Sequence, residues 1–380
     1  MKVVIALDSF KGSLGSYEAG QAVKEGILRA NPEARCVVVP IADGGEGTVD
    51  ALVKATGGTK KELIASDPLG RPITCAYGIL GDTRRAVIEM AAAAGITLLE
   101  PNERNPLKTS TYGVGEMILH AAKEGCRHFI IGIGGSATND GGAGMLQALG
   151  FDLLEKNGKP IARGAAGLAD LDKIDGKNAA KALSECTFFV ACDVSNPLCG
   201  EMGCSAVFGP QKGADKEMIA QMDGWLLKYS EKMKECFPSS DRCAPGAGAA
   251  GGLGFALMAL GGTLTSGIDL VLKETGIEDE IKDADIVIVG EGRLDAQTVM
   301  GKAPFGVASI AKKYGKPVIG FAGAVAKDAT VCNQYGIDAF FPVLRSVCTL
   351  EEALDPKTAY ANVADTAEQV FRLLKTGEKI

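Results

Sequence analysis

Residues 2–13 read KVVIALDSFKGS, and this stretch decides the expected fold. Five apolar residues follow Lys2, which predicts a strand that is buried on both faces. The strand is followed by the polar residues Asp8, Ser9 and Lys11 and then by an amphipathic segment, residues 16–29, that predicts a helix. A buried strand that leads directly into a helix is typical of a parallel α/β sheet.

The same alternation recurs near both ends of the chain. We expect further strands at residues 35–42, 284–289, 317–321 and 339–343, and helices at residues 47–55, 306–313 and 357–375. These elements together predict an α/β domain with a parallel sheet that is covered on both faces.

The middle of the chain has a different pattern. Residues 73–80 and 85–90 predict a hairpin around Gly81-Asp82, further strands are expected at 129–132 and 187–191, and residues 216–234 predict a long polar helix. We therefore expect a discontinuous α/β domain of residues 1–64 and 266–380, with a second, mixed-sheet α/β domain of residues 65–265 inserted into it. The alternative is two consecutive domains that meet near residue 200.

Charge and histidine content exclude several functional classes. Forty basic and 47 acidic residues give a net charge of −7, which argues against a nucleic-acid partner. The chain has only two histidines, so most Ser-His-Asp and histidine-ligated zinc sites are hard to build. Acid–base chemistry is therefore expected from carboxylates or lysines.

The cysteines and the apolar stretches indicate the compartment. Eleven cysteines without a C-x-x-C pair predict neither a zinc site nor a disulfide framework, and reduced thiols favour a cytoplasmic protein. The apolar run at residues 3–7 is too short for a signal peptide. Residues 244–268 carry no charge but are rich in glycine, so we expect a loop and a buried helix there and no membrane partner.

Two expected strand ends near the N-terminus carry candidate binding residues. Asp8, Ser9 and Lys11 follow the first strand, where ligands bind in parallel sheets and where a helix N-terminus favours an anion. The alternative is an ordinary loop with capping residues. The segment Asp43-Gly44-Gly45-Glu46 ends the second strand, and its glycines allow the backbone to approach a ligand. Asp43 and Glu46 could hold hydroxyls or Mg²⁺, although such a segment alone is only a turn.

A glycine-rich loop follows the strand expected at residues 129–132. It reads GIGGSATNDGGAG from residue 132 to residue 144, and its backbone N–H groups could form a phosphate-binding nest. The candidates for phosphate contact are Gly134, Gly135, Ser136 and Thr138. The loop is not a Walker A motif, because no Gly-Lys-Ser/Thr follows. A tight helix-packing turn and a degenerate dinucleotide fingerprint are the alternatives.

The fourth candidate segment, residues 290–304, follows the most apolar strand of the chain. Arg293 and Lys302 could neutralise phosphoryl oxygens, and Asp295 could accept a proton or hold a metal ion. A structural salt-bridge cluster is the alternative. Asp193, after the strand at 187–191, is a further candidate carboxylate, and Lys212 in Gly-Pro-Gln-Lys-Gly is either a ligand contact or a solvated surface residue.

These segments together resemble the first class of bacterial glycerate kinases. The matching blocks occur in the family's order, and they are DSFKGS at 8–13, ADGGEGT at 42–48, the loop at 132–142, CDV and NPL at 192–198, GPQKG at 209–213 and GEGRLD, QT and GKAP between 290 and 304. The resemblance implies phosphorylation of D-glycerate with ATP and Mg²⁺. It also implies two α/β domains, one of them Rossmann-like or flavodoxin-like, with the active site in the cleft between the domains. The implied product is 2-phosphoglycerate, with 3-phosphoglycerate as the alternative.

The chemistry of a kinase then suggests a role for each candidate. Asp295 would be the general base or would orient the attacking hydroxyl, and Asp193 would be the leading Mg²⁺ ligand, with exchange of these two roles left open. Lys11 is expected to neutralise charge in catalysis. The residues expected to bind ATP are Gly134, Gly135, Ser136, Thr138, Lys212 and Lys302. The residues expected to bind glycerate are Asp8, Ser9, Asp43, Gly44, Gly45, Glu46 and Arg293.

Two other functional classes remain open from the sequence. A nicotinamide-dependent oxidoreductase would use residues 132–137 as its fingerprint, with Asp152 or Glu155 at the ribose. A non-catalytic glycerate or nucleotide sensor would bind the same ligands without turnover. The chain is expected to be a monomer or a homodimer.

Overall fold

The structure is a computed structural model that describes residues 1–81 and 83–377, so Asp82 of the predicted hairpin turn lies outside the described residues. The described chain divides into two compact units. Unit 1 comprises residues 1–43, 50–56 and 268–380, and unit 2 comprises residues 44–49 and 57–267. Residues 44–49 and 57–64 therefore belong to unit 2, although residues 1–64 were expected to belong to the first domain.

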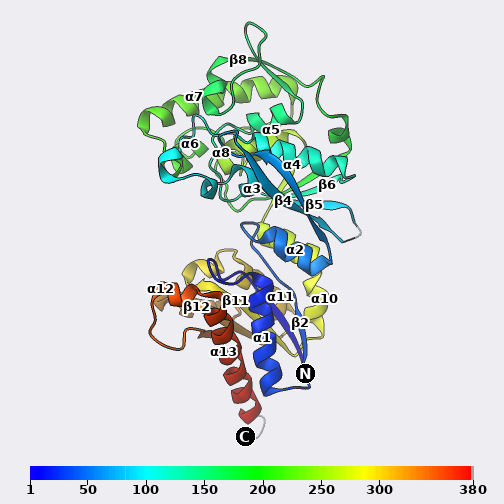
Figure 1. Ribbon diagram of the computed structural model, residues 1–380, viewed down its shortest axis with the longest axis vertical. Helices are drawn as coiled ribbons and strands as arrows, with labels where there is room; N and C mark the ends of the chain where they lie inside the picture. Colours follow the sequence, from blue (N-terminus) through cyan, green and yellow to red (C-terminus); the bar gives the residue numbers. More distant parts are fainter. Residues whose placement is uncertain (82, 378–380) are drawn as a thin grey trace. The chain divides into compact units, whose positions relative to one another are not determined.

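Unit 1 contains a parallel five-stranded sheet in the order β13-β12-β11-β1-β2. Strands β2, β11 and β12 of this sheet are labelled in Figure 1. Every neighbouring pair in this sheet is parallel, with Leu7 of β1 opposite Gly290 of β11. All six residues of β1 are buried, as a central strand covered on both faces requires. The strands are β1 (Lys2–Leu7), β2 (Arg35–Val38), β11 (Ile286–Leu294), β12 (Val318–Val325) and β13 (Ala339–Pro342).

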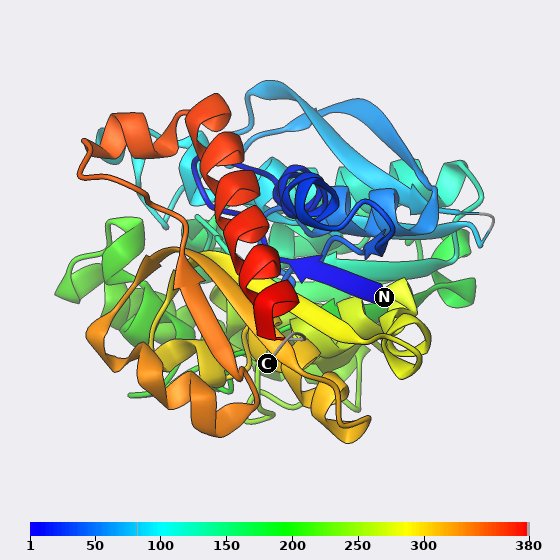
Figure 2. The ribbon, with the colours of Figure 1, turned by 90° about the horizontal axis from the view of Figure 1, so that it is seen from below.

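Helices α1 (Ser16–Ala30) and α13 (Pro356–Gly377) pack side by side on one face of this sheet (Figure 2). The two helices approach closely because α1 carries a glycine at the crossing. A Cβ atom at Gly26 would lie 2.0 Å from the backbone oxygen of Ala364. The other helices that contribute to unit 1 are α2 (Thr48–Thr56), α9 (Gly267–Thr275), α10 (Ile277–Lys282), α11 (Ala303–Lys313) and α12 (Leu350–Leu354).

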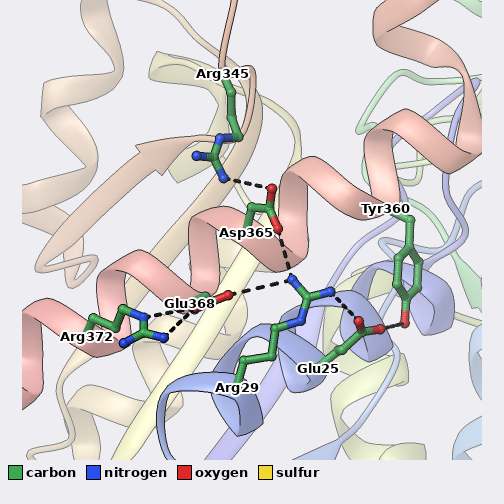
Figure 3. A network of polar contacts seen from close by, with 7 residues as sticks. All are labelled: Glu25, Arg29, Arg345, Tyr360, Asp365, Glu368 and Arg372. Atoms are coloured by element: carbon green, nitrogen blue, oxygen red, sulfur yellow. Dashed lines mark hydrogen bonds and ion pairs between the residues drawn. The ribbon is translucent and has the colours of Figure 1, made fainter.

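A network of exposed ion pairs joins α1 to α13 (Figure 3). Arg29 of α1 lies 3.0 Å from Asp365 and 3.7 Å from Glu368, both on α13. Because exposed pairs contribute only about 0–1 kcal/mol each, the apolar contacts beneath the network dominate this packing. The network also includes Glu25, Arg345, Tyr360 and Arg372.

Unit 2 contains a six-stranded mixed sheet in the order β10-β9-β6-β5-β4-β3. The pairs β3–β4 and β4–β5 are antiparallel, whereas β5–β6, β6–β9 and β9–β10 are parallel. The strands are β3 (Thr59–Ser66), β4 (Pro72–Leu80), β5 (Arg85–Glu89), β6 (His128–Gly132), β9 (Thr187–Ala191) and β10 (Thr263–Thr265). A separate antiparallel pair is formed by β7 (Asp152–Glu155) and β8 (Leu171–Asp175).

The helices of unit 2 surround one continuous apolar core. They are α3 (Ala91–Ala94), α4 (Tyr112–Lys123), α5 (Ala143–Ala148), α6 (Cys204–Phe208), α7 (Lys216–Cys236) and α8 (Ala249–Ala259). The Gly/Ala-rich segment forms α8 and is almost entirely buried, and among the described residues no helix is long and apolar enough to cross a membrane.

The predicted fold class is confirmed, because unit 1 holds a parallel sheet and unit 2 a mixed one. The predicted hairpin forms as the antiparallel pair β4–β5. The predicted strand at 35–42 was too long, since β2 ends at Val38, two residues before Pro40, which has no N–H for the ladder. The strands β3, β7, β8 and β10 were not predicted.

Candidate functional site

The glycine-rich loop of unit 2 connects β6 to α5 and presents two glycines to solvent. Gly134 and Gly135 are exposed, whereas residues 136–140 are buried. Gly135 has a φ of 72°, a left-handed conformation that favours glycine. The loop is also held from the neighbouring segment, since the N–H of Ile96 donates to the oxygen of Gly135 over 2.8 Å. The exposed Gly134–Gly135 backbone thus lies on a well-fixed base.

Asp140 holds the far side of this loop. Its carboxylate is fully buried and accepts hydrogen bonds from the backbone N–H groups of Thr111, Gly142 and Gly144 over 2.8–3.2 Å. The Thr111 hydroxyl donates to the same carboxylate over 3.0 Å. Burial raises the pKa of Asp140, and these hydrogen bonds oppose that change. Asp140 therefore has a structural role in fixing the loop.

Lys212 supports the glycine-rich loop from the interior of unit 2. The ammonium group is buried, and it donates to the hydroxyl of Ser136 over 2.8 Å and to the backbone oxygen of Thr138 over 2.6 Å. Burial lowers the pKa of Lys212 from 10.5 to about 8, and no carboxylate forms a salt bridge with it among the described residues. The surface alternative for Lys212 is therefore wrong, because the side chain is in the interior and in contact with the predicted phosphate loop.

The hydroxyl of Thr138 is too deeply buried to contact a ligand at the surface of the loop directly. Thr138 is fully buried, and its Oγ1 atom has no hydrogen-bond partner within the described part of the chain. Ser136 is 9 % exposed, so the polar surface of the loop consists mainly of backbone at Gly134 and Gly135.

The segment 44–49 packs against the glycine-rich loop within unit 2. A Cβ atom at Gly132 would lie 2.4 Å from the carbonyl oxygen of Gly44, and one at Gly134 would lie 3.7 Å from the Cα atom of Gly45. The backbone of Val49 donates to the Glu89 carboxylate over 2.8 Å at the end of β5. Gly44 and Gly45 thus lie beside the loop, and Glu46, which follows them in the chain, is exposed.

Asp193 lies at the same sheet edge, two residues after β9. Its side chain is exposed, and its Oδ1 atom accepts a hydrogen bond from the backbone N–H of Gly267 over 3.1 Å. Gly267 also contacts the segment 44–49, because a Cβ atom at Gly44 would lie 2.8 Å from the Cα atom of Gly267. The carboxyl ends of β6 and β9 therefore bring together the glycine-rich loop, the Gly44–Gly45 backbone and Asp193.

In unit 1, Asp8 follows β1 directly and is 6 % exposed. Its Oδ1 atom accepts a hydrogen bond from the backbone N–H of Ser9 over 2.6 Å. Burial and the nearby Asp43 carboxylate raise the pKa of Asp8 to about 7, although the Ser9 N–H and the Lys11 ammonium group act in the opposite direction. Lys11 itself is exposed, beside the backbone of Gly292 in β11.

Glu291 is a buried carboxylate in β11, next to β1 in the sheet. Its Oε1 atom accepts a hydrogen bond from the hydroxyl of Thr298 over 2.6 Å, and its Oε2 atom lies 3.5 Å from the ammonium group of Lys302. Burial raises the pKa of Glu291, and both contacts counteract this effect. Lys302 also lies 3.8 Å from Asp295, so it links the two carboxylates.

Asp295 serves as the N-cap of a short 3₁₀ helix, residues 296–299. Its Oδ1 atom accepts a hydrogen bond from the Gln297 N–H over 2.9 Å, and its Oδ2 atom lies 3.5 Å from Nε of Arg293. Both oxygens of Asp295 are therefore engaged, whereas the Arg293 side chain is 70 % exposed and extends into solvent.

Glu291 and Thr298 belong to the motifs between residues 290 and 304, but the sequence suggested no role for either residue. In the structure both are part of the polar network of unit 1. An acidic residue directly after the apolar run 286–290 was the available signal for Glu291. Thr111, which contacts Asp140 from a separate segment, has no comparable signal in the sequence.

The candidate residues divide between the units. Unit 1 carries Asp8, Ser9, Lys11, Asp43, Arg293, Asp295 and Lys302, and unit 2 carries Gly44, Gly45, Glu46, Gly134, Gly135, Ser136, Thr138, Asp193 and Lys212. In the described parts of the chain, no group of three or more His, Cys, Asp or Glu residues has the spacing to hold a metal ion. Any metal would need further ligands from water or a substrate.

The chain matches the glycerate kinase family over residues 3–375. The chain belongs to the glycerate kinase family. The chain is 48 % identical to the "Glycerate 2-kinase" of Escherichia coli K12 over 378 residues, which cover 99 % of both chains. It is 47 % identical to the "Glycerate kinase" of Bacillus subtilis 168 over 361 residues, which cover 95 % of this chain and 94 % of that protein.

A solved structure gives the same result for the fold. The crystal structure from Salmonella typhimurium LT2 that carries the name glycerate kinase 2 has 48 % sequence identity to this chain, and the match covers 100 % of both chains with a TM-score of 0.92. The protein is therefore an enzyme of the kinase class, and the nicotinamide-dependent alternative is not supported.

Proposed function

We propose that this protein transfers the γ-phosphoryl group of ATP to D-glycerate in a Mg²⁺-dependent reaction that yields 2-phosphoglycerate. The observation that carries this proposal in the structure is the exposed Gly134–Gly135 backbone on a base fixed by Lys212 and Asp140. A rigid loop of this kind suits phosphoryl transfer, because catalysis of that reaction depends on positioning and charge neutralisation.

The proposed nucleotide site lies in unit 2. The backbone N–H groups of Gly134 and Gly135 and the hydroxyl of Ser136 would bind phosphate oxygens. Lys212 has two of its three N–H donors directed to the loop, so it would contribute positive charge beneath the phosphates and keep Ser136 in place. Thr138 is buried, so it would support the phosphate-binding backbone through the hydrogen bond between its carbonyl oxygen and Lys212. Lys302, in unit 1, is proposed to contact the transferring phosphoryl group.

The Mg²⁺ proposal depends on Asp193. Mg²⁺ prefers oxygen ligands, keeps several waters and usually binds through one or two carboxylates together with substrate phosphates. An exposed carboxylate with one oxygen fixed by the Gly267 N–H fits that requirement. Asp193 would therefore hold an ion that arrives with the nucleotide, and the bound ion would neutralise charge on the phosphate oxygens.

The proposed glycerate site uses the polar residues at the carboxyl ends of the strands. Lys11 and Arg293 are exposed cations that would bind the substrate carboxylate or the transferring phosphoryl group. Asp295, held in one orientation by Gln297 and Arg293, would orient the attacking hydroxyl. The remaining residues proposed to contact glycerate are Asp8, Ser9, Asp43, Gly44, Gly45 and Glu46.

A steady-state assay of ADP release tests the proposal. ADP formation is expected to require D-glycerate, ATP and Mg²⁺ together, and to stop when the divalent ion is removed by a chelator. L-Glycerate and lactate, which lacks the second hydroxyl, serve as matched controls. ADP release that is independent of D-glycerate, or ligand binding without turnover, would contradict the proposal.

A further inference from the structure

Three carboxylates lie within or directly after strands of the unit 1 sheet, and they differ in which groups already contact their oxygens. Both oxygens of Asp295 are engaged, by the Gln297 N–H and by Arg293. Both oxygens of Glu291 are engaged as well, by the Thr298 hydroxyl and by Lys302. Each of these carboxylates has a cation beside it and is held in a fixed position.

Asp8 is different. It is 6 % exposed, and the only hydrogen bond that it accepts among the described residues comes from the N–H of the adjacent Ser9, to Oδ1. Its Oδ2 atom accepts none from the part of the chain that the structure describes. A buried carboxylate usually has several donors, so Asp8 retains acceptor capacity at the edge of the sheet where parallel α/β proteins bind ligands.

We propose that Asp8 is the residue that accepts the proton from the attacking hydroxyl of glycerate. This inference rests on the proposed function. The O–H bond of the glycerate hydroxyl breaks and its proton passes to the Asp8 carboxylate, while the hydroxyl oxygen forms a bond to the γ-phosphorus. The bond between that phosphorus and the β,γ-bridging oxygen breaks, and ADP leaves with the electron pair. Asp8 returns its proton to solvent after product release.

The electrostatics around Asp8 agree with this role. Burial has the largest effect on Asp8 and favours a bound proton, as do the Asp43 carboxylate, which follows β2, and Glu291 in β11. The Ser9 N–H and Lys11, both in the loop of Asp8, favour the ionised form. Lys302 lies near Glu291 and also near Asp295, so a cation and a further carboxylate are close to this group. The resulting pKa of about 7 is close to the value at which a general base is ionised at neutral pH and still retains basicity.

The test is the pH dependence of kcat/KM for D-glycerate, measured for the full chain and for Asp8→Asn, Asp8→Glu and Asp295→Asn. The unsubstituted enzyme is expected to gain activity with pH through a step near pH 7. Asp8→Asn should lose about 10²–10⁴ in kcat, the usual contribution of a general base, and should lack that step. Asp8→Glu should recover part of the activity and the step, because it restores a carboxylate.

Two comparisons make the result decisive. Asp295→Asn should be less active but keep the step near pH 7, and Asp172→Asn, an exposed aspartate in β8, should match the unsubstituted enzyme. Circular dichroism of each variant checks that the chain is folded. A folded Asp8→Asn with full activity, or with the step intact, overturns the proposal for Asp8 and leaves the kinase assignment standing. An unsubstituted enzyme that forms no phosphoglycerate overturns both.

Discussion

Replacement of Asp8 by Asn should stabilise the protein, and the gain should depend on pH. Burial and the Asp43 carboxylate raise the pKa of Asp8 from 3.8 to about 7 in the folded chain. A carboxyl with a higher pKa in the folded state binds its proton more tightly there, so folding stability falls as the pH rises through the interval between the two pKa values. Ionised Asp8 thus opposes folding above about pH 7, and this cost disappears below about pH 4.

The size of the effect follows from the same interval. At about 1.36 kcal/mol per pH unit, the difference between the two pKa values lowers the free energy of unfolding by about 4 kcal/mol near pH 8, where folded Asp8 is ionised, and by about 2 kcal/mol near pH 5, where it is protonated. Because asparagine has a similar shape and no charge, Asp8→Asn should raise the free energy of unfolding by up to these amounts.

Urea unfolding followed by circular dichroism at both pH values measures this difference. The exposed Asp172→Asn is the matched control, and it should change the free energy of unfolding by less than about 0.5 kcal/mol. The reasoning would be refuted if Asp8→Asn were less stable than the unsubstituted chain near pH 8, or if its gain were equal at both pH values.

Three further variants test the other parts of the site. Asp140→Asn should destabilise the chain by about 1–3 kcal/mol, because in either orientation its amide NH₂ faces a backbone N–H that now has no acceptor; unchanged stability in urea would argue against Asp140 as the anchor of the loop. Lys212→Met should raise the KM for ATP tenfold or more and leave the KM for D-glycerate within about twofold, since it removes support from Ser136 and Thr138; equal changes in both constants would indicate general damage instead. Lys11→Met should mainly raise the KM for D-glycerate, and an unchanged value would remove Lys11 from the proposed carboxylate site.

Much of the architecture could be predicted from apolar runs. Residues 3–7 and 286–290 are continuous runs without a polar side chain, and the burial of their strands in a parallel sheet follows from that composition. Strands β7 and β8 were missed because DLLE and LDKID are short and polar, so neither has a clear period of two. Strand β3 was missed because its burial is partial along most of its length.

The candidate site was predictable where position in a strand decides it. The proximity of Asp8 and Asp43 could be predicted, because the two residues follow strands that were expected at the same edge of a sheet. The position of Gly44 against Gly132 was not predictable, since a close approach between two backbone segments leaves only glycines in the sequence. The burial of Lys212 could not be predicted either, because its hydrogen-bond partners are a hydroxyl and a carbonyl group in a loop that is distant in the sequence.

The central claim is that this chain phosphorylates D-glycerate, and a ³¹P NMR time course with ATP, Mg²⁺ and D-glycerate tests it most directly. The account predicts that a new phosphomonoester signal rises together with ADP. In the proton-coupled spectrum that signal should be a doublet, because the phosphate of 2-phosphoglycerate is attached to a carbon with one hydrogen. A triplet would indicate 3-phosphoglycerate and contradict the proposed product, and ADP with free phosphate alone, or no change at all, would contradict the claim itself.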